Sequence, residues 1–159
     1  MTIVNILRPV LTALPRGQSL PDEAWVARHR WMQRVLWAHV AVLFCWSLIS
    51  GDSLLQALLG TGVIAACGIV TGQHRLGRRA RAAAICIGLL TASAVVVHLM
   101  HGAIEGHFHF FVMVTLLALY QAWFPYLLAF AYVLVHHGIF GALVPETVFN
   151  HHSALHSPW

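Results

Sequence analysis

The stretch Ala82-Ala-Ala-Ile-Cys-Ile-Gly-Leu-Leu-Thr-Ala-Ser-Ala-Val-Val-Val-His-Leu-Met100 contains no Asp, Glu, Lys or Arg. A helix of this length crosses a hydrocarbon core of about 30 Å, because each residue adds about 1.5 Å of rise. Four further apolar runs flank it, two on each side, at 35–50, 54–71, 108–123 and 124–144. These runs predict an all-α fold, a polytopic transmembrane helical bundle with five spans.

The composition of the whole chain is that of a membrane protein. Of its 159 residues, 59% are hydrophobic and 9% are charged, and the mean hydropathy is +0.75. Soluble domains carry roughly 25% charged residues. We therefore expect a cytoplasmic or interfacial segment at 1–30, a transmembrane domain at 31–144 and a periplasmic-side tail at 145–159, with little room for a soluble module.

The charge distribution predicts the orientation in the membrane. All nine basic residues are arginines, and they occupy only the N-terminal segment and the loop between the second and third apolar runs: Arg8, Arg16, Arg28, Arg30, Arg34, Arg75, Arg78, Arg79 and Arg81. By the positive-inside rule that side is cytoplasmic, with the N-terminus inside. We expect a multi-pass protein of the bacterial inner membrane. The pI near 9.5 reflects this anchoring and requires no nucleic-acid partner.

Short local signals predict where helices begin and turn. Pro21-Asp22-Glu23 is typical of a helix start, and that helix is expected to continue into the first span. Gln121-Ala-Trp-Phe-Pro125 leaves space only for a tight hairpin, so the fourth and fifth helices should be antiparallel neighbours. The small-xxx-small patterns at 68–72 and 102–106 favour close helix packing or dimerisation. The three cysteines occur singly, which indicates packing rather than a disulfide.

Most of the twelve histidines follow position 97, inside or beside apolar runs. A polar or ionisable group in hydrocarbon costs several kcal/mol unless it is paired or bound. Helix rise places His98, His109 and one of the pair His136 and His137 at similar depths, about 8–12 Å below the outer surface. The candidate metal-binding residues, with a rim and a lid added, are His98, His101, Glu105, His107, His109, His136, His137 and His151.

The remaining histidines receive other interpretations. His39 is expected near the inner face, about 20 Å from this cluster by helix rise, as a packing or second-site residue. His29 and His74 are expected to be solvated loop residues. Any single intramembrane histidine has a simpler alternative, a hydrogen bond to a neighbouring helix. Tyr132, one turn before His136, is a candidate second-shell hydroxyl.

The side chains of the cluster bear on which cofactor it would hold. Imidazoles with one carboxylate and no nearby cysteine suit zinc, copper(II) or iron, whereas calcium and magnesium prefer oxygen ligands. Two histidines on facing helices would alternatively hold a haem. The number of histidines exceeds what one haem uses, so we favour a site with one or two transition-metal ions.

Four segments of the second half of the chain carry a resemblance to a known family: 98–113, Ala118-Leu-Tyr-Gln-Ala-Trp-Phe-Pro125, His136-His137-Gly and Val148-Phe-Asn-His151. They resemble the membrane-embedded N-terminal region of some bacterial diguanylate cyclases and methyl-accepting chemotaxis proteins. The resemblance covers roughly residues 30–159. It implies a sensory membrane region that is followed, after one more helix, by a cytoplasmic output domain. This chain stops where that helix would begin, either as a truncated module or as a free-standing relative.

The sequence therefore favours a membrane sensory domain in which a transition-metal site near the outer leaflet signals through helix rearrangement. Its expected partners are the lipid bilayer, a metal ion or small redox or gas ligand, an output domain and a second copy in a homodimer. The alternatives are a small membrane metallo-oxidoreductase or a bis-histidine haem protein. The oxidoreductase lacks the usual repeated His-x-x-His-His boxes. A metal or proton transporter is a third hypothesis, but the second run has no titratable residue for a polar pathway, apart from Cys67.

Overall fold

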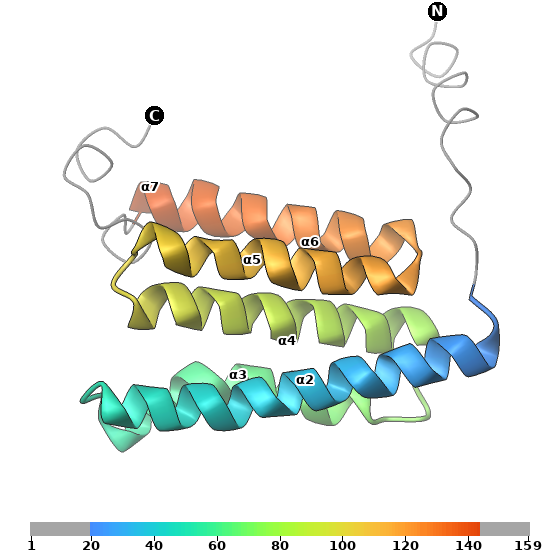
Figure 1. Ribbon diagram of the computed structural model, residues 1–159, viewed down its shortest axis with the longest axis horizontal. Coiled ribbons are helices and arrows are strands. Elements are labelled where there is room, and N and C mark those ends of the chain that lie inside the picture. The colour runs from blue at the N-terminus through green and yellow to red at the C-terminus, as the bar shows by residue number, and fades with distance from the viewer. Residues whose placement is uncertain (1–19, 144–159) are drawn as a thin grey trace, which may run out of the picture.

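The computed structural model describes residues 20–143, and every regular element in that range is helical (Figure 1). The long helices are α2 (Asp22–Ile49), α3 (Leu54–Thr71), α4 (Arg78–Leu99), α5 (Ile104–Leu117) and α6 (Trp123–Val135). A 3₁₀ turn at Ala118–Tyr120 extends α5, and a π-helical turn at His136–Phe140 joins α6 to the short α7 (Gly141–Leu143). The prediction of an all-α fold is confirmed.

Four helical segments are long and apolar enough to cross a membrane: Asp22–Ile49, Leu54–Thr71, Arg78–Leu99 and Trp123–Leu143. The remaining segment, Ile104–Tyr120, is apolar but shorter. These five segments overlap the five predicted runs, and the fourth begins at Ile104 rather than at 108. The first of them begins well before position 35, because the helix already starts at Asp22.

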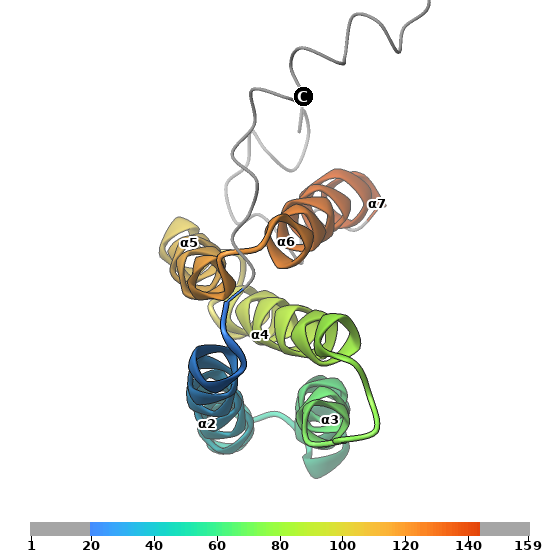
Figure 2. The same cartoon turned by 90° about the vertical axis from the view of Figure 1, so that its right-hand side faces the viewer.

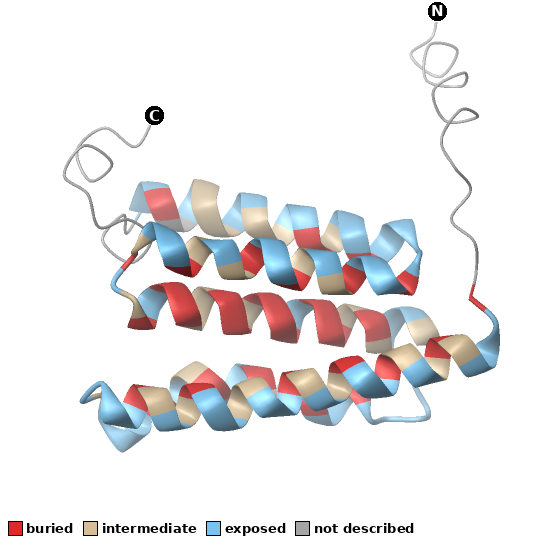
Figure 3. Ribbon diagram, viewed as in Figure 1, coloured by how far each residue is buried: buried red, intermediate tan, exposed pale blue. Residues whose placement is uncertain are grey.

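Helix α4 is the centre of the bundle. It packs against each of the other four long helices, with α2 and α3 below it and α5 and α6 above it in Figure 1. The end-on view of Figure 2 shows α2 and α5 toward one side of α4, and α3 and α6 toward the other. Its most apolar stretch is 67% buried, against 12–28% for the other three long spans (Figure 3). Helix α4 is thus a core helix, whereas the outer helices expose apolar faces suited to lipid.

Glycines allow α4 and its neighbours to approach closely. A Cβ atom built on Gly88 would lie 2.8 Å from Leu36 Cδ1 and 2.9 Å from the Cβ of Cys67. A Cβ on Gly68 would lie 2.9 Å from the Trp37 ring, and one on Gly106 would lie 3.3 Å from the Cα of Val97. The predicted packing roles of Gly68 and Gly106 are therefore confirmed. Gly88, at the junction of α2, α3 and α4, was not predicted.

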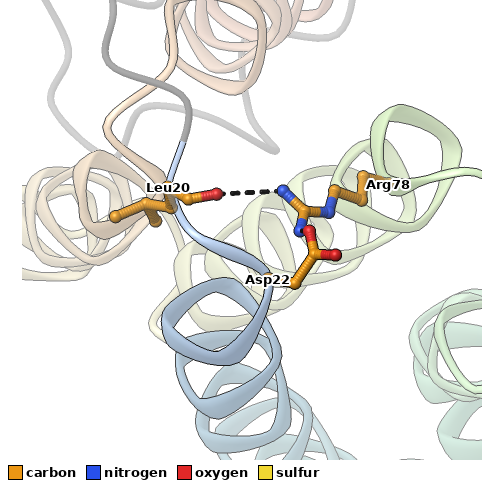
Figure 4. Close-up of polar contacts among 3 residues, drawn as sticks. All are labelled: Leu20, Asp22 and Arg78. Atoms are coloured by element: carbon orange, nitrogen blue, oxygen red, sulfur yellow. Dashed lines mark hydrogen bonds and ion pairs between the residues drawn. The ribbon is translucent and has the colours of Figure 1, made fainter.

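The helix ends form as the local sequence indicates. Helix α2 begins after Pro21 with two acidic residues in its first turn, as predicted. Arg78, at the start of α4, pairs with Asp22 and donates a hydrogen bond to the Leu20 carbonyl (Figure 4). This contact ties the starts of α2 and α4 together at what we call the arginine-rich end, the end of the bundle that carries Arg28, Arg30, Arg34, Arg75, Arg78, Arg79 and Arg81.

The connections between helices are short and specific. Ser53 and Gln56 form a reciprocal capping box at the start of α3. The α5–α6 hairpin turns at Gln121, whose φ is +51°, and places Pro125 in the first turn of α6. The predicted antiparallel hairpin is confirmed. At the opposite corner, between α4 and α5, both His101 and Gly102 have positive φ.

Candidate functional site

Two histidines from different helices meet inside the bundle, between α2 and α5. The Nε2 atoms of His39 and His109 lie 3.2 Å apart, and their rings meet edge to face. His39 Nδ1 donates to the Val35 carbonyl, one turn earlier in α2, over 2.7 Å. His109 Nδ1 lies 2.8 Å from the hydroxyl of Ser93, a fully buried residue of α4. Three helices therefore position this pair.

A second histidine group lies between α5 and the end of α6. The ring centroids of His107 and His137 are 5.2 Å apart, and those of His136 and His137 are 5.1 Å apart. His107 Nδ1 donates to the Ala103 carbonyl over 3.1 Å, and His137 Nδ1 donates to the Val133 carbonyl over 3.0 Å. His136 and His137 both belong to this group, and the π-helical turn begins at His136.

Aromatic side chains surround the second group. Phe110 lies 5.1 Å from His136 and 5.5 Å from His137 between ring centroids. Tyr132 stacks on His136, and its hydroxyl is 3.1 Å from Thr91 Oγ1 of α4. A cavity of about 420 Å³ opens beside the group between α5 and α6, and it is lined mainly by apolar and aromatic residues with His107 and His137.

Three of the predicted ligands lie apart from these contacts. His98, His101 and Glu105 are all exposed at the corner between α4 and α5, and within residues 20–143 none of them stacks on or hydrogen-bonds to another histidine. In this range, no group of three or more His, Cys, Asp or Glu side chains is placed to hold a metal ion. His151 lies outside the described residues. The ligand set inferred from the sequence therefore stays a prediction.

The expectation for His39 was wrong. It was placed about 20 Å from the cluster because the first span was counted from near Arg34. Helix α2 instead begins at Asp22 and has 28 residues, so His39 lies beyond its midpoint and reaches His109. The predicted depth of His39 was wrong because it treats Arg34 as the inner boundary of the span, although the helix already begins at Asp22.

The expectation for His29 was also wrong. Its side chain is fully buried, with Nδ1 2.6 Å from the Tyr120 hydroxyl and Nε2 3.2 Å from the Thr71 carbonyl. The ring stacks on Trp25 with centroids 4.5 Å apart. A signal for this existed in the sequence, because Trp25, His29, Met32 and Leu36 recur at helical spacing and form one buried stripe.

Several arginines of the arginine-rich end hold helices together in addition to carrying positive charge. Arg81 donates from Nε to the Thr71 carbonyl over 2.9 Å, and Arg28 donates to the Leu119 carbonyl over 2.6 Å. The guanidinium groups of Arg78 and Arg81 lie over the Trp25 ring, 5.3 Å and 5.1 Å from its centroid. These contacts join α2, the end of α3, the start of α4 and the 3₁₀ turn after α5.

Polar contacts therefore bridge α2 and α5 at two levels, through His39 and His109 inside the bundle and through His29 and Tyr120 at the arginine-rich end. We call these four residues the α2–α5 seam. The backbone of α2 packs against α3 and α4, and that of α5 packs mainly against α4, rather than the two packing against each other. The seam is thus held by side chains that reach across from one helix to the other.

Comparison with known proteins identifies a relative. No protein-family model matches the sequence, and no solved structure matches it. The chain is 34% identical, over 165 aligned positions, to the transducer protein Htr8 of Halobacterium salinarum. The alignment covers 96% of this chain and 26% of that protein.

This relative supports the transducer part of the resemblance, while the diguanylate cyclase part stays a prediction. The relative is archaeal, so the expectation of a bacterial membrane also stays a prediction. The chain is a multi-pass membrane protein that is homologous to the N-terminal part of a halobacterial transducer, and it spans about a quarter of the length of that relative.

Proposed function

We propose that this chain is the membrane-embedded input domain of a signal transducer. Its homology to the N-terminal part of a transducer supports this role. So does the bundle itself, whose exposed apolar faces suit lipid and whose interior carries polar contacts between helices. Polar side chains cost free energy inside a membrane unless they are paired. Ionisable residues in such positions therefore mark candidate functional sites.

The proposed topology has five crossings with the arginine-rich end in the cytoplasm. The clustering of all arginines of residues 20–143 at that end supports it. The α2–α3 and α4–α5 corners then face outward, with His98, His101 and Glu105 at the outer rim. In this position Glu105 attracts cations toward the histidines below it. The shorter helix α5 crosses with its 3₁₀ extension included.

The proposed stimulus acts through a transition-metal ion, copper, iron or zinc, held by the histidines between the helices. One observation carries this proposal. His39, His107 and His137 each donate Nδ1–H to the carbonyl four residues earlier in their own helix. Metal-binding histidines usually donate their second ring N–H to a carbonyl or carboxylate, which fixes the tautomer and directs Nε2 toward the metal.

The proposed signal is a shift of α2 against α5. A ligand that binds one arrangement of the α2–α5 seam more tightly than another changes the populations of the two arrangements. Helix shifts of about 1–2 Å are a common form of such switching. Because His29 and Tyr120 join the same helices at the arginine-rich end, movement at His39 and His109 would reach the side where an output domain is expected.

A chimaera tests the proposed role. Residues 1–159 replace the matching part of the halobacterial transducer in cells that lack it, and the cellular response that this transducer controls is recorded under metal, redox and gas stimuli. We expect a stimulus-dependent response that is lost in the His39→Ala and His109→Ala variants and kept in His74→Ala. An inserted chimaera whose response is constant under every stimulus would contradict an input role.

A further inference from the structure

The hydrogen bonds around His39 and His109 constrain where the ring protons lie. A carbonyl oxygen only accepts, so His39 Nδ1 must carry a proton for the Val35 carbonyl, and a neutral His39 then has a lone pair on Nε2. Ser93 lies 3.2 Å from the Leu89 carbonyl, to which its single hydroxyl proton can be donated. Ser93 then accepts from His109 Nδ1–H, and His109 Nε2 also carries a lone pair.

With all three of these bonds made at once, two lone pairs face each other across 3.2 Å. Such a contact is repulsive unless both lone pairs bind one positive centre, which for a metal ion lies beside the line that joins the nitrogen atoms. A proton is one solution, and a metal ion is the other. Without a bound ion, the alternative is that the Ser93 hydroxyl donates to His109 Nδ1 instead of to the Leu89 carbonyl. His109 then carries its proton on Nε2 and donates it to His39 Nε2.

The distance discriminates among metal geometries. With metal–nitrogen bonds of about 2.0–2.1 Å, two imidazoles on one tetrahedral ion have nitrogens about 3.3 Å apart, whereas two ligands on opposite sides of an ion lie about 4 Å apart. The observed 3.2 Å fits the tetrahedral case. It does not fit the opposed axial ligands of a bis-histidine haem.

We propose that the Nε2 atoms of His39 and His109 are the protein ligands of one tetrahedral transition-metal ion of the zinc(II) type, with Ser93 as the positioning residue. This inference rests on the metal-binding part of the proposed function and names its site. On loading, the His109 proton moves from Nε2 to Nδ1 and Ser93 turns from donor to acceptor, so no net proton is released. Two coordination positions remain for water or a small ligand, one more than in the usual catalytic zinc site with three protein ligands.

The assignment differs from the sequence-based one in a specific way. His109 belongs to both, but His39 replaces His98, which is exposed on α4. Ser93, fully buried on the same helix, holds His109 instead. All four carboxylates of the described range, Asp22, Glu23, Asp52 and Glu105, lie near helix ends. No carboxylate would therefore neutralise the charge of the bound ion inside the bundle. Because this weakens binding, we expect an exchangeable ion rather than a permanently held one.

A Co²⁺ titration of the whole chain in detergent, followed by the visible bands of tetrahedral cobalt, tests this assignment. We expect one equivalent to bind the unaltered chain and binding to be lost in His39→Ala and in His109→Ala. Ser93→Ala should bind about 10–100-fold more weakly, because it removes a partner that orients a ligand. The exposed residues provide matched controls, and His98→Ala and His74→Ala should bind as the unaltered chain does.

The remaining outcomes are also decisive. Helix content and the thermal midpoint of each variant are measured by circular dichroism, and His39→Gln replaces His39→Ala if the latter does not fold. Unchanged Co²⁺ binding in folded His39 and His109 variants would overturn the assignment. If only His107→Ala and His137→Ala abolish binding, the assignment fails while a metal-binding input domain stands. A folded chain that binds no Co²⁺ leaves the histidine pair as a proton-sharing contact and overturns the assignment, whereas the chimaera tests the input role separately.

Discussion

At the scale of single residues, the polar side chains inside this bundle are held in specific hydrogen bonds. His29 is the clearest example, because both ring nitrogens are engaged and the ring is fully buried. Its removal leaves the Tyr120 hydroxyl without that partner in an apolar setting. Unpaired buried polar groups cost about 1–3 kcal/mol each.

We therefore expect His29→Ala to lower the free energy of unfolding by about 1–3 kcal/mol. His74→Ala is the matched control, since His74 is exposed in the α3–α4 loop, and it should change the free energy little. The measurement is reversible unfolding in mixed detergent micelles, followed by circular dichroism. Equal stability of the two variants would show that the His29 contacts contribute nothing.

The sequence indicates which residues are polar within apolar runs, but it does not indicate which of them meet. His107 and His109 were selected from sequence, and both make contacts between helices. His98 was selected by the same reasoning and is exposed. The difference lies in the rotation of α4 about its axis, which directs Ser93 rather than His98 toward α5. Ser93 and His98 are five residues apart, about 1.4 turns of the helix, and hydropathy alone does not indicate which of them faces α5.

At the scale of helices, α4 packs against all four other long helices, and its Gly88 lies at a close contact between them. Gly88 admits Leu36 and Cys67 at distances where a methyl group would collide. Gly62 on α3 has open space at the same position. These two glycines, both within helices, therefore separate the effect of packing from the general preference of helices for alanine.

Gly88→Ala is expected to destabilise the bundle by about 1–3 kcal/mol, because it overpacks a close junction. Gly62→Ala is expected to be neutral or to stabilise by up to about 1 kcal/mol through helix propensity. Thermal unfolding midpoints in detergent compare the two variants. A Gly88→Ala midpoint equal to or above that of Gly62→Ala would be inconsistent with close packing at α4.

The helices themselves could be predicted where hydropathy is continuous. The bounds of α3 match the predicted apolar run 54–71, and the α5–α6 hairpin was predicted because Pro125 carries a strong local signal. The start of α2 at Asp22 was predicted, but the apolar run was counted only from position 35, since Arg28, Arg30 and Arg34 interrupt the apolar character of the helix on its exposed or partly exposed face. The buried residues of α2 recur at helical spacing from Trp25 onward, and they indicate the start of the helix better than continuous hydropathy does.

At the scale of the whole molecule, the distribution of arginines predicts the orientation. Single cysteines at exposed positions on opposite ends test it in a background in which Cys45, Cys67 and Cys86 are replaced by alanine. A membrane-impermeant thiol reagent should label Ile104→Cys in intact cells, because that position begins α5 at the outward corner. His74→Cys should react only after permeabilisation. The reverse labelling pattern would place the arginine-rich end outside.

The proposed function depends on movement of α2 against α5 when the histidine pair is occupied. Ala27 on α2 and Ala118 after α5 are both exposed near the arginine-rich end. Spin labels on Ala27→Cys and Ala118→Cys, in the same cysteine-free background, report the distance between the two helices by pulsed electron paramagnetic resonance. These positions lie away from His39 and His109, so the labels do not disturb the proposed site.

This distance measurement, made with and without Zn²⁺, tests the account most directly. We predict that Zn²⁺ shifts the distance between the labels by about 1–2 Å, the usual extent of helix shifts in switching proteins. The shift should be absent when His39→Ala or His109→Ala is added and present when His98→Ala is added. An unchanged distance in a chain that demonstrably binds Zn²⁺, or the same shift in the His39→Ala chain, would contradict a metal-responsive input domain that works through the α2–α5 seam.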